Sequence, residues 1–134
     1  MLHKPQLTHD DADRIMQAAR NEAISNGWRV SIAVVDAAGD LMAFDRLDGA
    51  ISPSCTVAIQ KARTAALWKR DTLYWEKRLI DKPTYSQLPD NFAVEGGVPL
   101  EFESHCVGGI GVSGARTDDD ARIATAGAAR LKGS

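Results

Sequence analysis

The chain of 134 residues is 44% hydrophobic and 25% charged, with a formal net charge of −2 at pH 7. This composition is typical of a soluble globular protein with one domain, residues 1–134, and it supplies no basic surface for nucleic acid. The longest apolar runs are too short to cross a bilayer and the opening MLHKPQLTHDD lacks the apolar segment of an export signal, so we expect a cytoplasmic protein without membrane or nucleic-acid partners.

The two cysteines are far apart in the sequence. Cys55 and Cys106 form no C-x-x-C pair, so the spacing suggests neither a zinc site nor a disulfide framework. We expect both to be reduced thiols.

The first part of the chain is predicted to form a helix and then a β-hairpin. Thr8 is a suitable N-cap, and the apolar spacing after it predicts an amphipathic helix from Asp10 to Ser25 that ends at Asn26-Gly27. The runs SIAVVD and DLMAFDR then flank Gly39, which suits the positive φ of a tight turn.

A second helix and an irregular segment follow. Ser52 offers an N-cap hydroxyl and Pro53 suits the first helical position, so a helix is predicted from Pro53 to about Lys69. Its many alanines would let it approach a sheet closely. The segment from Arg70 to Asn91 has no clear period and predicts a loop or a short broken helix, long enough to be functional or to clasp a partner subunit.

The last part is predicted to form a second hairpin and a helix. Strands are expected at about Val98 to Glu103 and at His105 to Ser113, and a helix with an acidic first turn is expected to begin at Thr117. Taken together, the order of elements predicts an antiparallel α+β fold of two hairpins with helices packed on the sheet.

The second strand of this late hairpin is rich in glycine. With a period of two, Gly109 and Gly111 share a face with Val107, while Cys106 lies on the other face. The glycine face leaves a bare strip of backbone that only a closely packed helix or a flat ligand would fill.

Familiar catalytic and metal motifs do not fit. The run GIGVSG matches a dinucleotide-binding pattern, but too few residues follow it for the required βαβ unit. Ser113 lacks the last glycine of a nucleophile elbow and has no His or Asp partner in a triad pattern. Aspartates 118–120 would point in different directions on a helix and form a solvated N-terminus, and the three histidines are too scattered for a ligand set. We therefore predict no metal site.

Two cations are candidate ligand-binding groups. Arg46 ends the first hairpin, and Lys61 lies within the alanine face of the second helix. Placed near the Gly96-Gly97 turn, they would favour an anionic group such as a carboxylate or a haem propionate. Alternatively, they neutralise carboxylates such as Asp36 and Glu95 in structural ion pairs.

One imidazole and one thiol are candidate ligands to haem iron. His105 and Cys106 are the residues in question. They point to opposite faces of a strand, so at most one would bind iron at a single site. An ordinary role as strand residues is the alternative.

Four segments occur in order between about Leu7 and Ala129, namely VSIAVVDAAGDLMAFDRLDGA, AIQKARTA, EGGVPL and VGGIGVSGARTDDD. Together they resemble the GlcG/HbpS family, which includes the C-terminal domain of the PduO adenosyltransferase. The resemblance implies a profilin-like or PAS-like fold, assembly into homo-oligomers and, for some members, binding of haem or a corrinoid-related ligand. The family's characteristic positions in this chain are Asp36, Gly39, Arg46, Asp48, Lys61, Ala62, Gly96, Gly97, Pro99, Gly111, Ser113, Gly114 and Asp119.

Three functional hypotheses follow. The first is a small oligomeric binding protein for haem or another anionic or tetrapyrrole ligand; its binding residues would be Arg46, Lys61, Gly96, Gly97, Pro99 and His105. The second is an enzyme without a metal that acts on a small carboxylated or aromatic metabolite, with Lys61 and either Asp36 or Glu95 as acid–base groups. The third is a structural accessory subunit of a catabolic pathway, in which the bare strand serves only helix packing.

Overall fold

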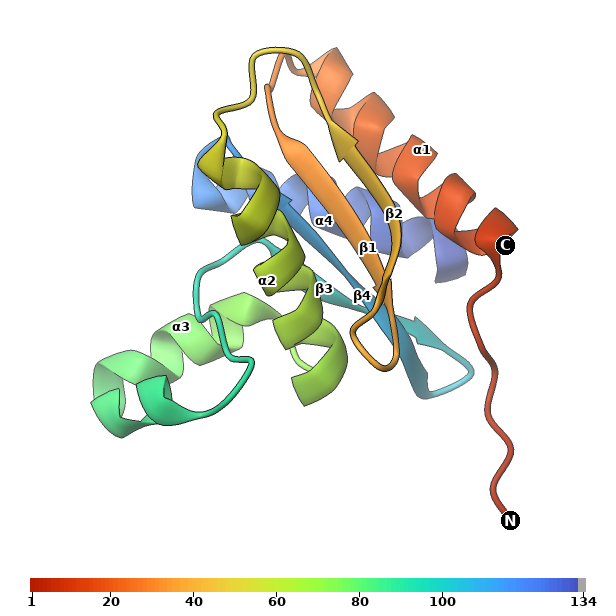
Figure 1. Cartoon of the computed structure of the whole chain (residues 1–134), viewed down its shortest axis with the longest axis vertical. Coiled ribbons are helices and arrows are strands. Elements are labelled where there is room, and N and C mark those ends of the chain that lie inside the picture. Colours follow the sequence, from red (N-terminus) through yellow and green to blue (C-terminus); the bar gives the residue numbers. More distant parts are fainter. Residues whose placement is uncertain (133–134) are drawn as a thin grey trace.

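A four-stranded antiparallel sheet forms the centre of the computed structural model, which describes residues 1–132 (Figure 1). The strand order β2-β1-β4-β3 places the two hairpins side by side, joined through β1 and β4. The elements are α1 (His9–Ser25), β1 (Ser31–Asp36), β2 (Leu41–Arg46), α2 (Pro53–Trp68), α3 (Thr72–Asp81), the 3₁₀ helix η1 (Pro83–Gln87), β3 (Gly97–Phe102), β4 (His105–Ser113) and α4 (Thr117–Lys132). None of the helices in residues 1–132 has both the length and the apolar character needed to span a membrane.

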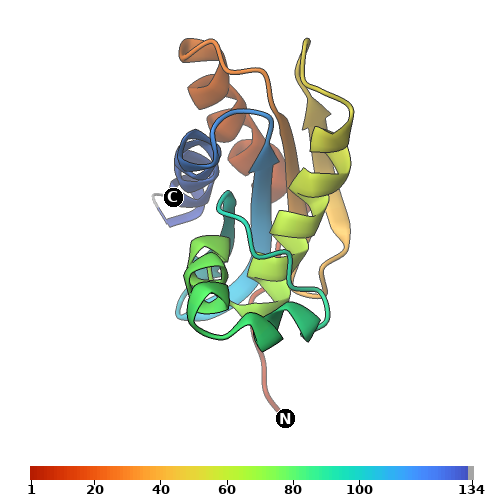
Figure 2. The ribbon, with the colours of Figure 1, turned by 90° about the vertical axis from the view of Figure 1, so that its left-hand side faces the viewer.

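Helices cover both faces of the sheet (Figure 2). α1 and α4 pack on one face, over the larger apolar core, which includes Ile15, Ile32, Ile110 and Ile123. α2 packs on the other face over a smaller cluster composed mainly of alanines. This arrangement confirms the predicted antiparallel α+β fold.

The helix starts show one prediction that is confirmed and one that is wrong. Thr8 caps α1 as predicted, because its hydroxyl accepts from the Asp11 N–H at 3.1 Å and its own N–H donates to the Asp11 carboxylate at 3.0 Å. Ser52 has helical backbone angles and makes no capping bond through its side chain. The hydroxyl of Ser54 instead donates to the carbonyl oxygen of Ile51 at 2.6 Å.

The segment from Arg70 to Asn91 forms a broken helix. α3 begins at Thr72, where the side chain of Asp71 caps it by accepting from the N–H of Tyr74 at 2.8 Å. The helix stops before Pro83, since proline supplies no N–H to continue the ladder, and η1 follows. The loop alternative for this segment is therefore wrong, and the broken-helix alternative is confirmed.

The bare strip of β4 is filled by α2. A Cβ atom built on Gly109 would collide with the carbonyl oxygen of Ala62, and one built on Gly111 would collide with that of Ala58. Backbone of helix and strand therefore touch directly, as the alanines Ala58, Ala62 and Ala66 on this side of α2 allow. Of the two predicted occupants of the strip, a helix and a flat ligand, the structure contains the helix.

A β-bulge in β4 changes which side chains face α2. Leu100 and Glu101 of β3 pair with Gly108 and Cys106, so Val107 is an extra residue in β4. Val107 joins the core beneath α1 and α4, and the Cys106 sulfur lies 3.6 Å from the carbonyl oxygen of Ala66 in α2. The predicted strict alternation, with Val107 on the glycine face and Cys106 opposite, is wrong because the bulge shifts the register by one residue.

A buried ion pair connects the two helical layers. Lys61 extends from α2, and its Nζ lies 3.3 Å from the Asp120 carboxylate of α4 and donates to the Val112 carbonyl oxygen at 2.9 Å. Both side chains of the pair are 2% exposed. Asp120 also accepts from the N–H of Ala115 at 3.0 Å. The prediction that all three aspartates 118–120 form a solvated helix start is therefore wrong for Asp120.

Burial shifts both members of this pair toward their neutral forms. Desolvation raises the pKa of Asp120 to about 6, although Lys61 and the Ala115 N–H oppose the rise. Desolvation likewise lowers the pKa of Lys61, against the opposing effect of Asp120. The burial cost therefore exceeds the mutual attraction, as is common for buried ion pairs.

Substituting Gly111 tests the close contact between α2 and β4. Gly111→Ala is expected to lower the free energy of unfolding by about 3 kcal/mol, because the methyl group must displace the α2 backbone. Gly27→Ala is the matched control, since no atom lies within 4 Å of its Cβ position and only its φ of +71° is unfavourable, at a cost of about 1 kcal/mol. Urea unfolding measures both values, and equal losses would contradict the proposed contact.

Substituting Lys61 tests the ion pair, and the test depends on pH. Because the pKa of Asp120 in the folded chain lies above its ordinary 3.8, the folded state holds the proton more tightly, and this group's contribution to stability falls as pH rises from 3.8 through about 6. Lys61→Met at pH 7 leaves a buried, unpaired carboxylate, so we expect a loss of about 3–5 kcal/mol that becomes smaller at pH 5.

The control for this test is the double variant Lys61→Met/Asp120→Leu, which removes both charges. It should recover much of the lost stability at pH 7, because apolar groups often replace a buried pair without net cost. Chemical unfolding at the two pH values measures the variants. An identical loss for Lys61→Met at pH 5 and pH 7 would show that the Asp120 charge is not responsible.

Candidate functional site

A groove of about 440 Å³ lies beside β3, and we call it the β3 groove. Its walls come from the residues before and within β3, from the start of α3 and from one face of α4. Four residues that the sequence singled out line it, namely Glu95, Gly96, Gly97 and Pro99. The opposite walls include Asp71, Leu73, Ala121 and Thr125.

Lys61 lies next to this groove without lining it. A Cβ atom built on Gly96 would be 2.7 Å from the Lys61 Nζ, so only glycine leaves room for the ammonium group there. Gly96 also has a φ of +133°, which other residues rarely adopt. The lysine is nevertheless directed at Asp120, so its charge is compensated inside the protein.

The groove has an acidic lining. Asp71, Glu95 and Glu101 all contribute to it, and no Lys or Arg from residues 1–132 does. Desolvation raises the pKa of Glu95, and the nearby carboxylates of Glu76 and Asp118 raise it further. Such a lining favours cationic or hydroxyl-bearing molecules over the anionic group that the sequence suggested.

Arg46 is not part of the β3 groove. It ends β2, at the opposite edge of the sheet from β3, and its guanidinium donates to the carbonyl oxygen of Ala50 at 2.9 Å. The structure therefore does not bring Arg46 together with Gly96 and Gly97.

Asp36 and His105 do not line the β3 groove. The Asp36 carboxylate accepts from the backbone N–H groups of Ala38 and Asp40 at 2.9 and 3.0 Å, which organises the hairpin turn. His105 begins β4 and pairs with Phe102 across the second hairpin. Glu95 lines the β3 groove next to Lys61, whereas Asp36 lies in the β1–β2 turn. The structure therefore separates Asp36 from the other two predicted acid–base groups.

A second cavity, of about 550 Å³, lies between the N-terminal segment and the β1–β2 turn. We call it the N-terminal cavity. The N-terminal segment runs past this end of the sheet in Figure 1. The lining includes His3, Lys4, Pro5, Asp36 and Val107. Sequence reasoning missed this site because residues before Thr8 have no periodic pattern, although a histidine next to a lysine was a usable signal.

The two cavities differ in how well they suit haem. The N-terminal cavity offers an imidazole in His3, an ammonium group in Lys4 and apolar surface from Leu2, Pro5 and Val107. These are the groups that bind iron, propionate and macrocycle respectively. The β3 groove has no histidine among its lining residues and would place carboxylates against the propionates, so it does not fit haem.

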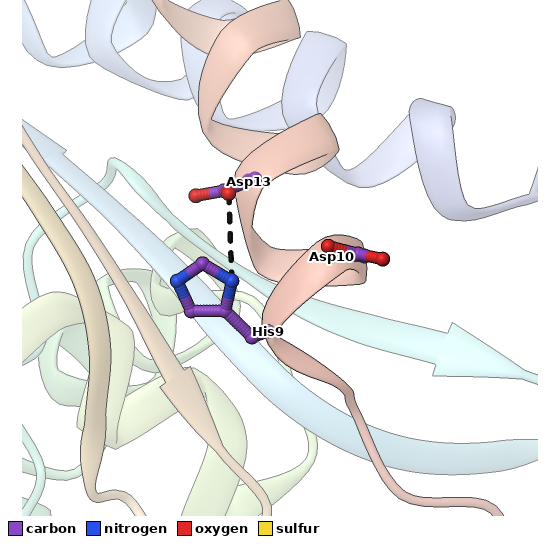
Figure 3. Close-up of side chains that lie close together, drawn as sticks. All are labelled: His9, Asp10 and Asp13. Carbon is purple, nitrogen blue, oxygen red and sulfur yellow. Dashed lines mark ion pairs between the residues drawn. The ribbon is translucent and has the colours of Figure 1, made fainter.

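Three side chains at the start of α1 lie close enough to share a cation. His9, Asp10 and Asp13 each offer a ligand atom within 4.8 Å of the others, and all three residues are exposed. Figure 3 shows the imidazole of His9 turned toward Asp13 and Asp10 set apart. The His9 Nδ1 and Asp13 Oδ2 atoms are 3.5 Å apart. An exposed pair one helical turn apart is already satisfied by its partner and by water, so this cluster does not by itself indicate a metal centre.

Comparisons with known proteins agree on one family. The family model described as "Haem degrading protein HbpS-like" matches residues 7–129. Protein GlcG of Escherichia coli K12 is 38% identical over 114 residues, which cover 84% of this chain and 85% of GlcG. A protein of Citrobacter freundii named as uncharacterized, from the dhaT-dhaS intergenic region, is 28% identical over 88% of this chain and 87% of its own length.

Solved structures give the same result. A double mutant of Streptomyces reticuli HbpS is 38% identical and superimposes with a TM-score of 0.91, covering 98% of this chain and 90% of that one. A PduOC complex with heme is 26% identical, with a TM-score of 0.87 over 94% of this chain and 95% of that one. The chain belongs to the GlcG/HbpS family, a family related to haem binding.

Proposed function

We propose that this protein binds haem in the N-terminal cavity, with the imidazole of His3 as a ligand to iron. The observation that carries this proposal is the combination of imidazole, ammonium group and apolar surface around one cavity of about 550 Å³. A structural relative that is 26% identical was solved as a complex with heme, which supports the same ligand class. When bound, haem would supply an iron centre whose reactivity its axial ligand tunes.

The residues that line the N-terminal cavity would have separate roles in haem binding. His3 would fix the iron and therefore the position of the ring in the cavity. Lys4 would pair with a propionate at the solvent-exposed rim, and Leu2 and Pro5 would cover part of the ring and exclude water from it. Asp36 is already bound to its own turn, so it would shape the wall without contacting iron.

Hemin titration of three histidine variants tests this assignment. We expect His3→Ala to weaken binding at least about tenfold and to shift the Soret band, since an axial ligand is lost. His9→Ala is the matched control, because His9 is also exposed and pairs with Asp13 on α1. It should bind hemin like the unmodified protein.

His105→Ala distinguishes the two imidazoles that this end of the molecule contains. His105 begins β4 two residues before Val107, which lines the cavity. A changed Soret band of bound hemin in His105→Ala, with an unchanged band in His3→Ala, would refute His3 as the iron ligand. It would assign the iron to His105 at the β3–β4 turn. Absence of saturable hemin binding by the unmodified protein would refute haem binding itself.

A second candidate function is acid–base catalysis in the β3 groove, and the raised pKa of Glu95 favours it. Glu95 would act on a hydroxylated or cationic metabolite, and Lys61 would influence it only through charge, because its ammonium group is paired with Asp120. In a turnover screen of such metabolites, Glu95→Gln should abolish activity, whereas Glu103→Gln, on the exposed β3–β4 turn, should retain it. Unchanged turnover in Glu95→Gln would exclude this role.

A further inference from the structure

One side-chain amide in this protein is buried and has no hydrogen-bond partner. Both Nδ2 and Oδ1 of Asn91 are shielded from solvent and unpartnered among residues 1–132. Buried polar groups in folded proteins are almost always hydrogen-bonded, so an orphaned amide with both donor and acceptor unused requires a physical reason. Asn91 follows directly after Asp90, which has a φ of +50°, in the segment that leads from η1 to β3.

A cavity of about 260 Å³ lies next to this amide, and we call it the Asn91 cavity. Its lining consists of Gln60, Arg63, Thr64, Asp90, Asn91 and Phe92. It shares no residue with the β3 groove or with the N-terminal cavity. The functions considered above therefore do not use it.

Most other polar groups of this cavity are already partnered, and the side chain of Gln60 is exposed to solvent. The Thr64 hydroxyl donates to the carbonyl oxygen of Gln60 and accepts from the N–H of Phe92, both at 2.8 Å. The guanidinium of Arg63 donates to the Gly39 carbonyl oxygen at 2.7 Å and pairs with Asp90 at 3.3 Å. These contacts fix the walls and balance the charge of Arg63. Within residues 1–132, the Asn91 amide is therefore the lining group that is both buried and without a partner.

We propose that the Asn91 cavity binds a small neutral molecule that carries a carboxamide group. A carboxamide presents one donor and one acceptor side by side and can form two parallel hydrogen bonds with the Asn91 amide. A charged ligand is disfavoured, because Arg63 and Asp90 already neutralise each other. The volume of the Asn91 cavity admits a molecule of roughly ten non-hydrogen atoms. The cavity is therefore smaller than most ligand-binding pockets.

To bind such a ligand, the Asn91 side chain must rotate until its amide group points into the Asn91 cavity. In the structure both amide atoms are shielded, so the ligand-free conformation leaves them unsatisfied. Rotation about the side-chain torsions is the small movement that exposes them to a ligand. The backbone can stay in place, because the N–H of Phe92 remains bound to Thr64. Hydrogen bonds to the ligand then offset the free energy that the unsatisfied amide costs in the free protein.

The competing explanation is ordered water, since a cavity of this size can hold several water molecules. Asn91→Leu separates the two. If the amide is unsatisfied in the free protein, the substitution removes a buried polar group and should raise Tm by about 3 °C. If water satisfies the amide, the substitution breaks those bonds and Tm should fall, which would overturn the proposal. Asn26→Leu is the control, because the Asn26 amide donates to the Glu22 carbonyl oxygen at 2.8 Å and its loss should not raise Tm.

Benzamide is the probe for the ligand class. Two-dimensional NMR of the ¹⁵N-labelled protein should show saturable shifts of the Asn91 side-chain amide with benzamide, and at least about tenfold weaker effects with benzoate, which has no donor. The backbone N–H signals of Thr64 and Phe92, which line the cavity, should shift with benzamide as well, and Asn91→Leu should abolish that response. No saturable shift in the unmodified protein, an equal response to benzoate, or benzamide binding that persists in Asn91→Leu would each overturn the proposal.

Discussion

Direct contact between the backbone of α2 and the backbone of β4 determines the rest of this structure. Gly109 and Gly111 place no side chain of β4 at two successive contacts with α2, so carbonyl oxygens of the helix lie against the strand. This contact restricts the position of α2, because close-packed backbone leaves little room for either element to shift. The side chains that α2 carries are consequently restricted in position as well.

Lys61 is the side chain whose position depends most clearly on the placement of α2. From α2 it reaches a carbonyl oxygen of β4 and the Asp120 carboxylate on α4, which lies on the opposite face of the sheet. The ion pair is buried and both members are shifted toward neutrality, so it contributes specificity of arrangement more than net stability. Gly96 completes the arrangement by leaving space for the ammonium group, and so connects the packing of α2 with the wall of the β3 groove.

Local patterns in the sequence predicted the elements well, whereas contacts between distant residues escaped them. The cap at Thr8, the hairpin at Gly39 and the alanine face of α2 each follow from residues next to one another, and the fold class follows from their order. The bulge at Val107 does not, because it depends on how β3 pairs with β4. The pairing of Lys61 with Asp120 joins residues 59 positions apart, so no spacing rule identifies it.

The cavities themselves lie in different parts of the molecule. The β3 groove, the N-terminal cavity and the Asn91 cavity have no lining residue in common. Occupants of any two of them therefore do not compete for space. One side chain nevertheless connects two of the sites, since Arg63 lines the Asn91 cavity and donates to the Gly39 carbonyl oxygen in the turn beside the N-terminal cavity. Simultaneous occupancy is the behaviour that this architecture favours, and any coupling between these two sites would act through Arg63.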